Sequence, residues 1–237
     1  MAETLLTTER LETFYGASQV LHGIDFSVRP GETIALIGRN GMGKTTFLRS
    51  LIGLVADRRG RITLKGKDIT KAPPEVISKG GMALVPEGRG VFGSLSVVEN
   101  LIMAARPGLD GRRTWTIERI FELFPRLHQR RTNGGHQLSG GEQQMLTIGR
   151  ALMTHPEIIL IDEATEGLAP LIAQEIWRMI DVIRSEGITT VVVDKDFKSL
   201  ARIADRAVVM SKGEIAFDGP PSELAAQPEL LNRYLGV

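Results

Sequence analysis

A glycine-rich stretch between a predicted strand and a predicted helix constrains this chain most. Residues 38–45 read GRNGMGKT, which fits the spacing G-x-x-x-x-G-K-[ST]. The strand before it, Thr33–Ile37 (TIALI), is almost wholly apolar, as in a parallel sheet buried on both faces, and Lys44–Leu54 is predicted to be helical. Such a loop lets backbone N–H groups converge on phosphate oxygens, because glycines carry no obstructing side chains. The alternative is an ordinary glycine-rich turn, against which the strand–loop–helix context argues.

This loop is therefore predicted to bind the phosphates of ATP. Lys44 would place a positive charge at the β- and γ-phosphates, and the hydroxyl group of Thr45 would ligate Mg²⁺. The residues predicted to contact the nucleotide here are Gly38, Arg39, Asn40, Gly41, Met42, Gly43, Lys44, Thr45 and Thr46.

Two adjacent carboxylates follow a second apolar strand, predicted at 157–161 (EIILI). Ligands bind at the C-terminal ends of strands in open α/β sheets, so Asp162 and Glu163 are expected near the glycine-rich loop. Asp162 is predicted to hold Mg²⁺, and Glu163 to act as the general base that polarises the attacking water. A strand that ends in Asp-Glu is by itself a weak signal, because strand ends are commonly charged and solvated.

A third motif begins the helix predicted to run to about Met153. Residues 138–144 read LSGGEQQ, in which Ser139 and Glu142 form a predicted capping box. A well-capped helix would explain these two residues, but Gly140 and Gly141 each cost helix propensity of about 1 kcal/mol. We interpret them as leaving N–H groups open to a second nucleotide, held by a neighbouring molecule. The sequence therefore predicts a head-to-tail dimer that encloses two ATP molecules.

Strands alternate with helices along the chain, which predicts an α/β fold with a parallel sheet. A helical block at about 94–153 interrupts this pattern. Further strands are predicted at 5–14, 23–28, 61–64 and 189–193, a hairpin at 208–217, and helices at 170–185 and 222–235.

The composition narrows the possible functions. The 237 residues carry a formal net charge of +1, which argues against a dedicated nucleic-acid binder. The absence of cysteine excludes disulfides and thiolate chemistry. No apolar run approaches the roughly 18–20 residues that cross a bilayer, and the first residues lack the apolar stretch of a signal peptide. Contact with a membrane is therefore expected only through partner subunits.

The glycine-rich loop, LSGGEQQ and IILIDE, in this order, resemble the ATP-binding cassette family over essentially the whole chain. This resemblance implies a P-loop NTPase (RecA-like) core at about 1–87 and 155–237, with an antiparallel β edge and an inserted helical subdomain at about 88–154. It also implies that Tyr15 stacks on adenine and that Glu87 lies in the loop that senses the γ-phosphate and Mg²⁺. Ser139, Gly140 and Gly141 would bind the partner's nucleotide.

Residues 85–101 (VPEGRGVFGSLSVVENL) and 162–170 (DEATEGLAP) are similar to the smaller ATPase subunit of branched-chain amino-acid importers. That branch implies two membrane permeases, a second, non-identical ATPase, an extracytoplasmic solute-binding protein and a place on the cytoplasmic face of the membrane. A soluble cassette ATPase without a transport role is the alternative, and a non-enzymatic scaffold is opposed by Lys44, Asp162 and Glu163.

Three residues depart from the general pattern of the resembled family. Glu87 replaces a glutamine, and Ala169 stands where an aspartate is usual. Lys195 occupies the place of a histidine that contacts the γ-phosphate, and its ammonium group would supply a positive charge there without a proton switch near pH 7. We therefore expect slow hydrolysis at this site and dependence on a partner ATPase.

Overall fold

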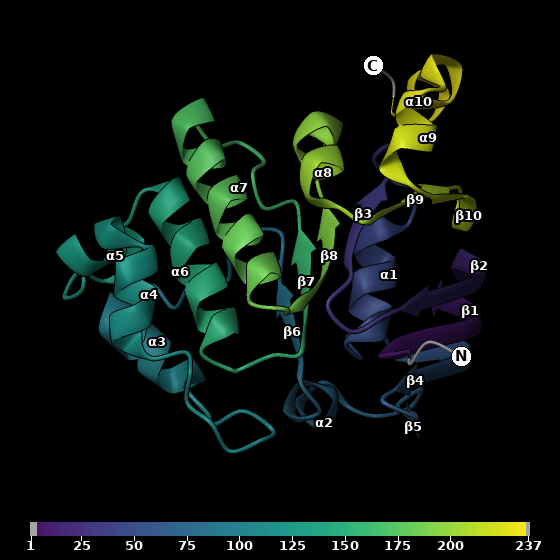
Figure 1. Ribbon diagram of the computed structural model, residues 1–237. Coiled ribbons are helices and arrows are strands. Elements are labelled where there is room, and N and C mark those ends of the chain that lie inside the picture. Colours follow the sequence, from purple (N-terminus) through teal and green to yellow (C-terminus); the bar gives the residue numbers. More distant parts are fainter. Residues whose placement is uncertain (1–3, 236–237) are drawn as a thin grey trace.

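The computed structural model describes residues 4–235, and its central element is a six-stranded sheet (Figure 1). Five parallel strands lie in the order β9-β3-β8-β7-β6, and β10 pairs antiparallel with β9. Their bounds are β3 Thr33–Ile37, β6 Met82–Val85, β7 Ile158–Asp162, β8 Thr189–Val193, β9 Arg206–Ser211 and β10 Glu214–Gly219. The predicted α/β fold with a parallel sheet is confirmed.

A second, antiparallel sheet lies at one side of the molecule (Figure 1). Its order is β2-β1-β4-β5, with bounds β1 Leu6–Tyr15, β2 Ser18–Val28, β4 Asp57–Leu64 and β5 Lys67–Asp68. β2 and β4 begin earlier than the alternation at 23–28 and 61–64 predicts. The added part of β4 is charged and has no clear alternation, and its pairing with β1, such as Thr13 opposite Arg58, extends the strand.

Two hydrophobic cores lie on opposite faces of the six-stranded sheet. Side chains alternate across a strand, so Ile34 and Leu36 of β3 face one core, and Ala35 and Ile37 face the other. The first core joins the sheet to α1 and to the antiparallel sheet, and the second joins it to the remaining long helices. β3 and β7 are therefore buried on both faces, which fixes the loops that follow them.

The predicted helical block at about 94–153 consists of α3 Val97–Ala104, α4 Ile117–Leu123, α5 Pro125–Gln129, a 3₁₀ turn Gly135–Gln137, α6 Gly140–Leu152 and the loops between them. The other helices are α1 Lys44–Leu51, α2 Pro74–Lys79, α7 Pro170–Ser185, α8 Phe197–Ile203, α9 Pro221–Ala225 and α10 Pro228–Leu235. α3 to α6 lie on the side of the sheet away from β1 and β2 (Figure 1). Within residues 4–235, no helix is long and apolar enough to cross a membrane.

Two predicted helices differ in extent. α1 ends at Leu51, three residues before the predicted end, and Gly53 follows with a left-handed φ of 86°. The tail predicted as one helix at 222–235 is divided between α9 and α10, because Pro228 lacks the N–H that a continuous helix needs.

Candidate functional site

The glycine-rich loop joins β3 to α1 and is held by contacts that exclude larger side chains. Gly38 has a φ of 145°, and a Cβ atom there would collide with the carbonyl oxygen of Met210. Gly43 is the N-cap of α1 with a φ of 100°, a conformation that favours glycine. The loop therefore presents backbone N–H groups and the positive end of α1 to the same space.

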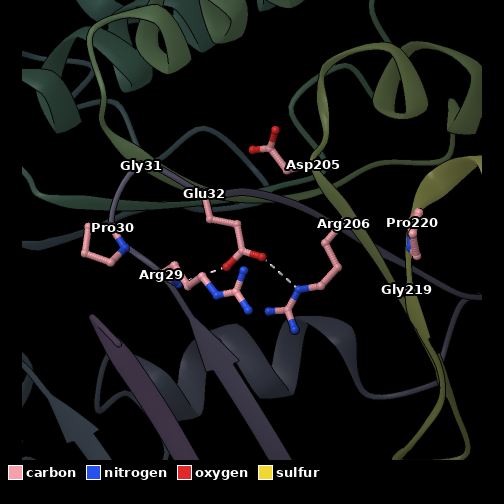
Figure 2. Close-up of a pocket in the computed structure, with 8 residues that line it drawn as sticks. All are labelled: Arg29, Pro30, Gly31, Glu32, Asp205, Arg206, Gly219 and Pro220. Carbon is pink, nitrogen blue, oxygen red and sulfur yellow. Dashed lines mark hydrogen bonds and ion pairs between the residues drawn. The ribbon is translucent and has the colours of Figure 1, made fainter. Parts of the chain in front are cut away.

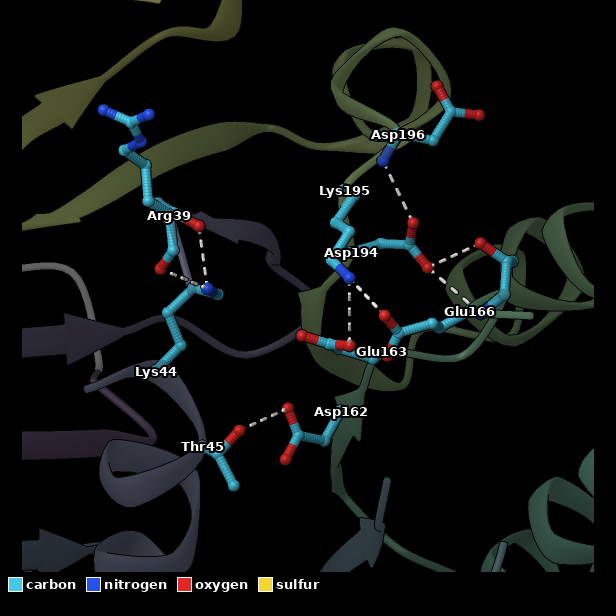
Figure 3. Close-up of polar contacts among 11 residues, drawn as sticks. Arg39, Lys44, Thr45, Asp162, Glu163, Glu166, Asp194, Lys195 and Asp196 are labelled. Carbon is cyan, nitrogen blue, oxygen red and sulfur yellow. Dashed lines mark hydrogen bonds and ion pairs between the residues drawn. The ribbon is translucent and has the colours of Figure 1, made fainter. Parts of the chain in front are cut away.

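Lys44 is buried within this loop. Its Nζ donates hydrogen bonds to the carbonyl oxygens of Gly38 at 2.7 Å and Arg39 at 3.0 Å (Figure 3). Burial lowers the pKa of Lys44 from its ordinary value, and the charges of Glu163 and Asp162 oppose that shift. The ammonium group is therefore held at the mouth of the loop, between its backbone and two carboxylates.

A cavity of about 320 Å³ opens over the loop and is lined by six of the nine loop residues predicted to contact the nucleotide. Its lining is formed by Val20, Asn40, Gly41, Gly43, Lys44, Thr45, Thr46, Glu87, Glu163 and Glu166. Gly41 has open space where a Cβ atom would lie, so this part of the loop stays accessible to a phosphate group.

Four of the residues predicted to contact the nucleotide of this chain itself lie outside that lining. Gly38 and Arg39 offer their carbonyl oxygens to Lys44, and Met42 accepts a hydrogen bond from the backbone N–H of Lys212 to its sulfur at 3.2 Å. Tyr15 ends β1 with its side chain about half exposed. Its exposed ring is compatible with stacking on a base.

Thr45 and Asp162 face one another between α1 and β7. The hydroxyl group of Thr45 donates a hydrogen bond of 3.2 Å to Oδ1 of Asp162 (Figure 3). Burial raises the pKa of the Asp162 carboxyl group. A hydroxyl and a carboxylate oxygen are hard ligands of the kind that Mg²⁺ prefers. Because burial disfavours the ionised form of Asp162, a bound cation would stabilise its carboxylate. These two residues therefore fit a magnesium ion.

Glu163 begins the turn between β7 and α7 with a left-handed φ of 51°. Its backbone N–H donates to the carbonyl oxygen of Val193 at 2.9 Å, which ties the turn to the end of β8. A hydrogen bond with Glu166, together with burial, raises the pKa of Glu163 to about 7. A carboxylate with such a pKa is suited to accept a proton near neutral pH.

Lys195 lies above these carboxylates with its side chain 54% exposed. Its Nζ is 3.9 Å from Glu163 and forms a close ion pair with Glu166 (Figure 3). The pair with Glu166 raises the pKa of Lys195, so the residue stays charged near pH 7. Lys195 therefore places a positive charge beside these carboxylates.

Glu87 also reaches the cavity. Carboxylate oxygens of Glu87, Glu163 and Glu166 all lie within 4.8 Å of one another. This acidic group is distinct from the Thr45–Asp162 pair, and Glu87 is the predicted metal ligand within it. Glu166 was not predicted from the sequence, although a third acidic residue three positions after Glu163 is a signal that could have indicated it.

Ser139, Gly140 and Gly141 lie outside the lining of the phosphate cavity. Ser139 caps α6, and its capping box with Glu142 is present as predicted. A Cβ atom on Gly140 would come within 2.5 Å of the Arg89 guanidinium group, and one on Gly141 would overlap Ile172. Gly141 therefore has a packing reason within this chain, whereas the flexible end of the Arg89 side chain can move away from a side chain at Gly140. No local pattern in the sequence predicts Arg89 as the neighbour of Gly140.

Ala169 is the N-cap of α7 and provides no side-chain cap. Aspartate is a favoured residue at such a position, where it accepts hydrogen bonds from N–H groups of the first turn. The departure noted in the sequence thus leaves this helix start without a side-chain acceptor.

A larger cavity, of about 590 Å³, lies at the opposite ends of the parallel strands (Figure 2). Glu32 there pairs with Arg206 at 2.9 Å and accepts a hydrogen bond from the backbone N–H of Arg29 at 2.8 Å. Asp205 accepts from the N–H of Thr33 at 2.8 Å. Glu32, Arg206 and Asp205 are engaged in these contacts, whereas the smaller cavity is lined by the glycine-rich loop and Lys44, which gives it the better chemistry for phosphate binding.

Comparison with known proteins agrees with this geometry. A family model described as ABC transporter matches residues 21–166. The chain belongs to the ABC transporter family. It is 39% identical over 232 residues to the high-affinity branched-chain amino acid transport ATP-binding protein BraG of Pseudomonas aeruginosa. The aligned region covers 98% of this chain and 100% of the relative. As a member of this family the chain is an ATPase.

Other relatives of this ABC ATPase are named for different transport systems. The lipopolysaccharide export system ATP-binding protein LptB of Acidithiobacillus ferridurans is 33% identical over 98% of this chain and 97% of its own length. Among solved structures, a nucleotide-free ATP-binding cassette from an ABC transporter has a TM-score of 0.83 at 25% identity, over 97% of this chain and 98% of that one. The fold and the ATPase assignment thus have independent support.

Proposed function

We propose that this ATPase energises an importer for branched-chain amino acids or related amides and carboxylates. The identity of 39% over nearly the full chain to BraG carries this proposal, together with the stretches at 85–101 and 162–170. Export is the second candidate, favoured by the full-length similarity to LptB at 33% identity. The higher identity to BraG supports the importer over the exporter.

The nucleotide would bind in the 320 Å³ cavity. Lys44 would exchange its hydrogen bonds with the loop carbonyls for the β- and γ-phosphates, and the N–H groups of residues 38–46 would bind phosphate oxygens. Tyr15 would stack on adenine. Thr45, Asp162 and Glu87 would hold Mg²⁺, which supplies positive charge to the phosphates when bound.

Glu163 would act as the general base of hydrolysis. It lines the cavity beside Lys44, and its pKa of about 7 lets it take a proton from a water molecule near neutral pH. The water oxygen then attacks the γ-phosphorus atom, and the bond to the β-phosphate oxygen breaks. Lys195, fixed as a cation, would offset the negative charge of the carboxylates at this end of the cavity.

The signature residues Ser139, Gly140 and Gly141 would serve a second ATPase subunit. They lie outside the cavity that their own chain offers to ATP, and they begin α6, where the helix dipole is positive. This supports a head-to-tail dimer in which residues at about 88–154 act as a helical subdomain beside a core at about 1–87 and 155–237.

Two permeases, a non-identical sister ATPase and an extracytoplasmic solute-binding protein complete the proposed importer, with this chain on the inner face of the membrane. The weakened positions Ala169 and Lys195 support an unlike partner ATPase. No nucleic acid enters this proposal, since the chain has a net charge of +1.

Purification of the tagged chain from its native membrane, followed by uptake assays, tests this function. We expect two permeases and a second ATPase to co-purify, and uptake of labelled leucine to be lost in the Lys44→Ala strain. Uptake that is unchanged in that strain for branched-chain amino acids and their amides would reject the importer. Co-purification of lipid-export components would favour the second candidate.

A further inference from the structure

Glu166 lines the phosphate cavity, where its hydrogen bond with Glu163 raises the pKa of that residue. It lies in the turn that follows β7, three residues after Glu163. Its carboxylate shares a hydrogen bond with that of Glu163 and an ion pair with Lys195. Glu166 therefore contacts both the proposed base and the nearest exposed cation.

Lys195 is placed by Glu166 more than by Glu163. The close contact of its Nζ is with Glu166, whereas Glu163 is 3.9 Å away. Its side chain is 54% exposed, so packing does not hold the ammonium group in place. A long exposed side chain samples many rotamers unless a partner fixes it, and Glu166 is that partner.

Asp194 fixes the backbone on both sides of this ion pair. Its Oδ2 accepts hydrogen bonds from the N–H of Thr165 at 3.1 Å and from the hydroxyl group of Thr165 at 2.7 Å. Thr165 precedes Glu166, and Asp194 precedes Lys195. The two ends of the ion pair thus start from segments joined to one another, which makes its geometry a property of the fold.

We propose that Glu166 is a positioning residue for ATP hydrolysis, which holds the Lys195 ammonium group beside Glu163 but at 3.9 Å, beyond hydrogen-bond distance from that carboxylate. The proposal rests on the role of Glu163 as general base. Without Glu166, the nearest carboxylate for Lys195 is Glu163 itself. A direct ion pair there would engage the lone pairs that must accept the proton of the attacking water.

The reactivity of Lys195 in the ligand-free chain tests the first half of this proposal. Acylation of Lys195 by an amine-directed reagent is measured by peptide mass spectrometry against exposed Lys198. We expect Glu163→Gln to leave Lys195 as protected as in the unaltered chain, because Glu166 still holds it. Adding Glu166→Gln should raise its reactivity roughly threefold to tenfold, since the rate follows the unprotonated fraction. Full reactivity after Glu163→Gln alone would overturn the proposal.

The kinetics of the membrane complex test the second half. We expect Glu166→Gln to lower kcat on the order of tenfold, a part of the general-base contribution, with the KM for ATP changed less than about twofold because Glu166 is no phosphate ligand. Adding Lys195→Gln should restore much of the rate, because no ammonium group then engages Glu163. Asp181→Asn, which removes a surface carboxylate paired with Arg184, is the control and should leave the rate unchanged.

All these rates are measured in a complex whose partner ATPase lacks its own general base, so the remaining turnover belongs to the site of this chain. A Glu166→Gln complex at the unaltered rate, or a double variant no faster than Glu166→Gln alone, would overturn the positioning role. If Glu163→Gln itself retains the full rate, the proposed base is wrong, and that failure is distinct because it does not depend on Glu166.

Discussion

Cγ2 of Ile172, on α7, occupies the space in which a side chain on Gly141 would lie. Gly141 belongs to the first turn of α6, and both helices contribute to the same hydrophobic core. The signature glycine therefore sets how closely α6 approaches α7. This relationship separates the packing role of Gly141 from any role in binding a nucleotide.

The effect of Gly141→Ala on the free energy of unfolding is expected to change sign when Ile172 is replaced. In the unaltered chain, the added methyl group overpacks against Ile172 and should destabilise the fold by about 1 kcal/mol or more. In an Ile172→Ala background the same change should stabilise it by about 1 kcal/mol, because alanine is the better helix former. Urea denaturation of the four proteins measures this cycle. Destabilisation of equal size in both backgrounds would refute the packing explanation.

Lys44→Ala should abolish the rise in melting temperature that MgATP gives to the purified chain. The change removes the ammonium group that faces the cavity and leaves the loop backbone in place. Ligand stabilisation depends on affinity through mass action, so a lost phosphate contact appears directly in the melt. Lys198→Ala is the matched control, because that lysine is exposed on α8. Equal stabilisation of Lys44→Ala and unaltered chain would exclude the predicted phosphate site.

The parts of the site that depend on local sequence were predictable. The glycine-rich loop, the Ser139 capping box and the strand before Asp162 each have a pattern within a few residues. The ion pair of Glu166 with Lys195 has none, because it joins residues 29 positions apart in the chain. It depends on the pairing of β7 with β8, which sets Asp162 opposite Val193 and brings the two following loops together.

The same reasoning explains the missed elements of the fold. α2 has six residues, too few to show a helical period, and α8 has seven. The 105–116 loop interrupts the block predicted as helical at about 94–153, whose helical apolar spacing is confined to 97–103 and 117–124, and α3 ends before Arg106 while α4 begins only at Ile117. Contacts with distant segments, such as the hydrogen bonds of Arg106 to Ser78 and Thr154, stabilise this loop.

Asp162→Asn and Glu163→Gln should differ in what they impair. Asp162 contacts Thr45 at the predicted metal ligands, so its amide should weaken retention of Mg²⁺ as well as turnover. Glu163→Gln should bind MgATP normally and slow hydrolysis by about 10²–10⁴-fold, since an amide cannot accept the proton. Magnesium titrations and single-turnover hydrolysis separate the two effects. The Glu163→Gln chain should also form a longer-lived ATP-dependent dimer by size-exclusion chromatography with its partner.

The pH dependence of kcat/KM should have an acidic limb set by Glu163. The general base must be ionised, and the hydrogen bond with Glu166 raises its pKa to about 7 in the ligand-free chain. The value of kcat/KM reports groups of the free enzyme, so it should fall about tenfold per pH unit below that pKa. A flat profile between pH 5 and 8 would contradict a base with this pKa.

The raised pKa of Glu163 should also affect the stability of the ligand-free chain, which should fall as the pH rises, whereas kcat/KM should rise. The pKa of Glu163 is raised from 4.5 to about 7, so its protonated form is favoured in the folded state. The stability from this group is present below pH 4.5 and is lost as the pH rises through 7. Because glutamine does not ionise, Glu163→Gln should not lose this stability. Relative to the unaltered chain, its free energy of unfolding should be about 1 kcal/mol more favourable at pH 8 than at pH 5, after allowance for partial exposure.

Thermal melts at both pH values measure this gain, which corresponds to about 2–4 °C for a chain of this length. The matched control is Glu75→Gln, at an exposed carboxylate of α2 far along the chain from the site, and its effect should be the same at pH 5 and pH 8. Glu166→Gln should reproduce part of the gain, because it removes the hydrogen-bond partner and the like charge that hold the pKa of Glu163 up. A Glu163→Gln effect independent of pH would show that Glu163 ionises in the folded chain as it does in the unfolded one.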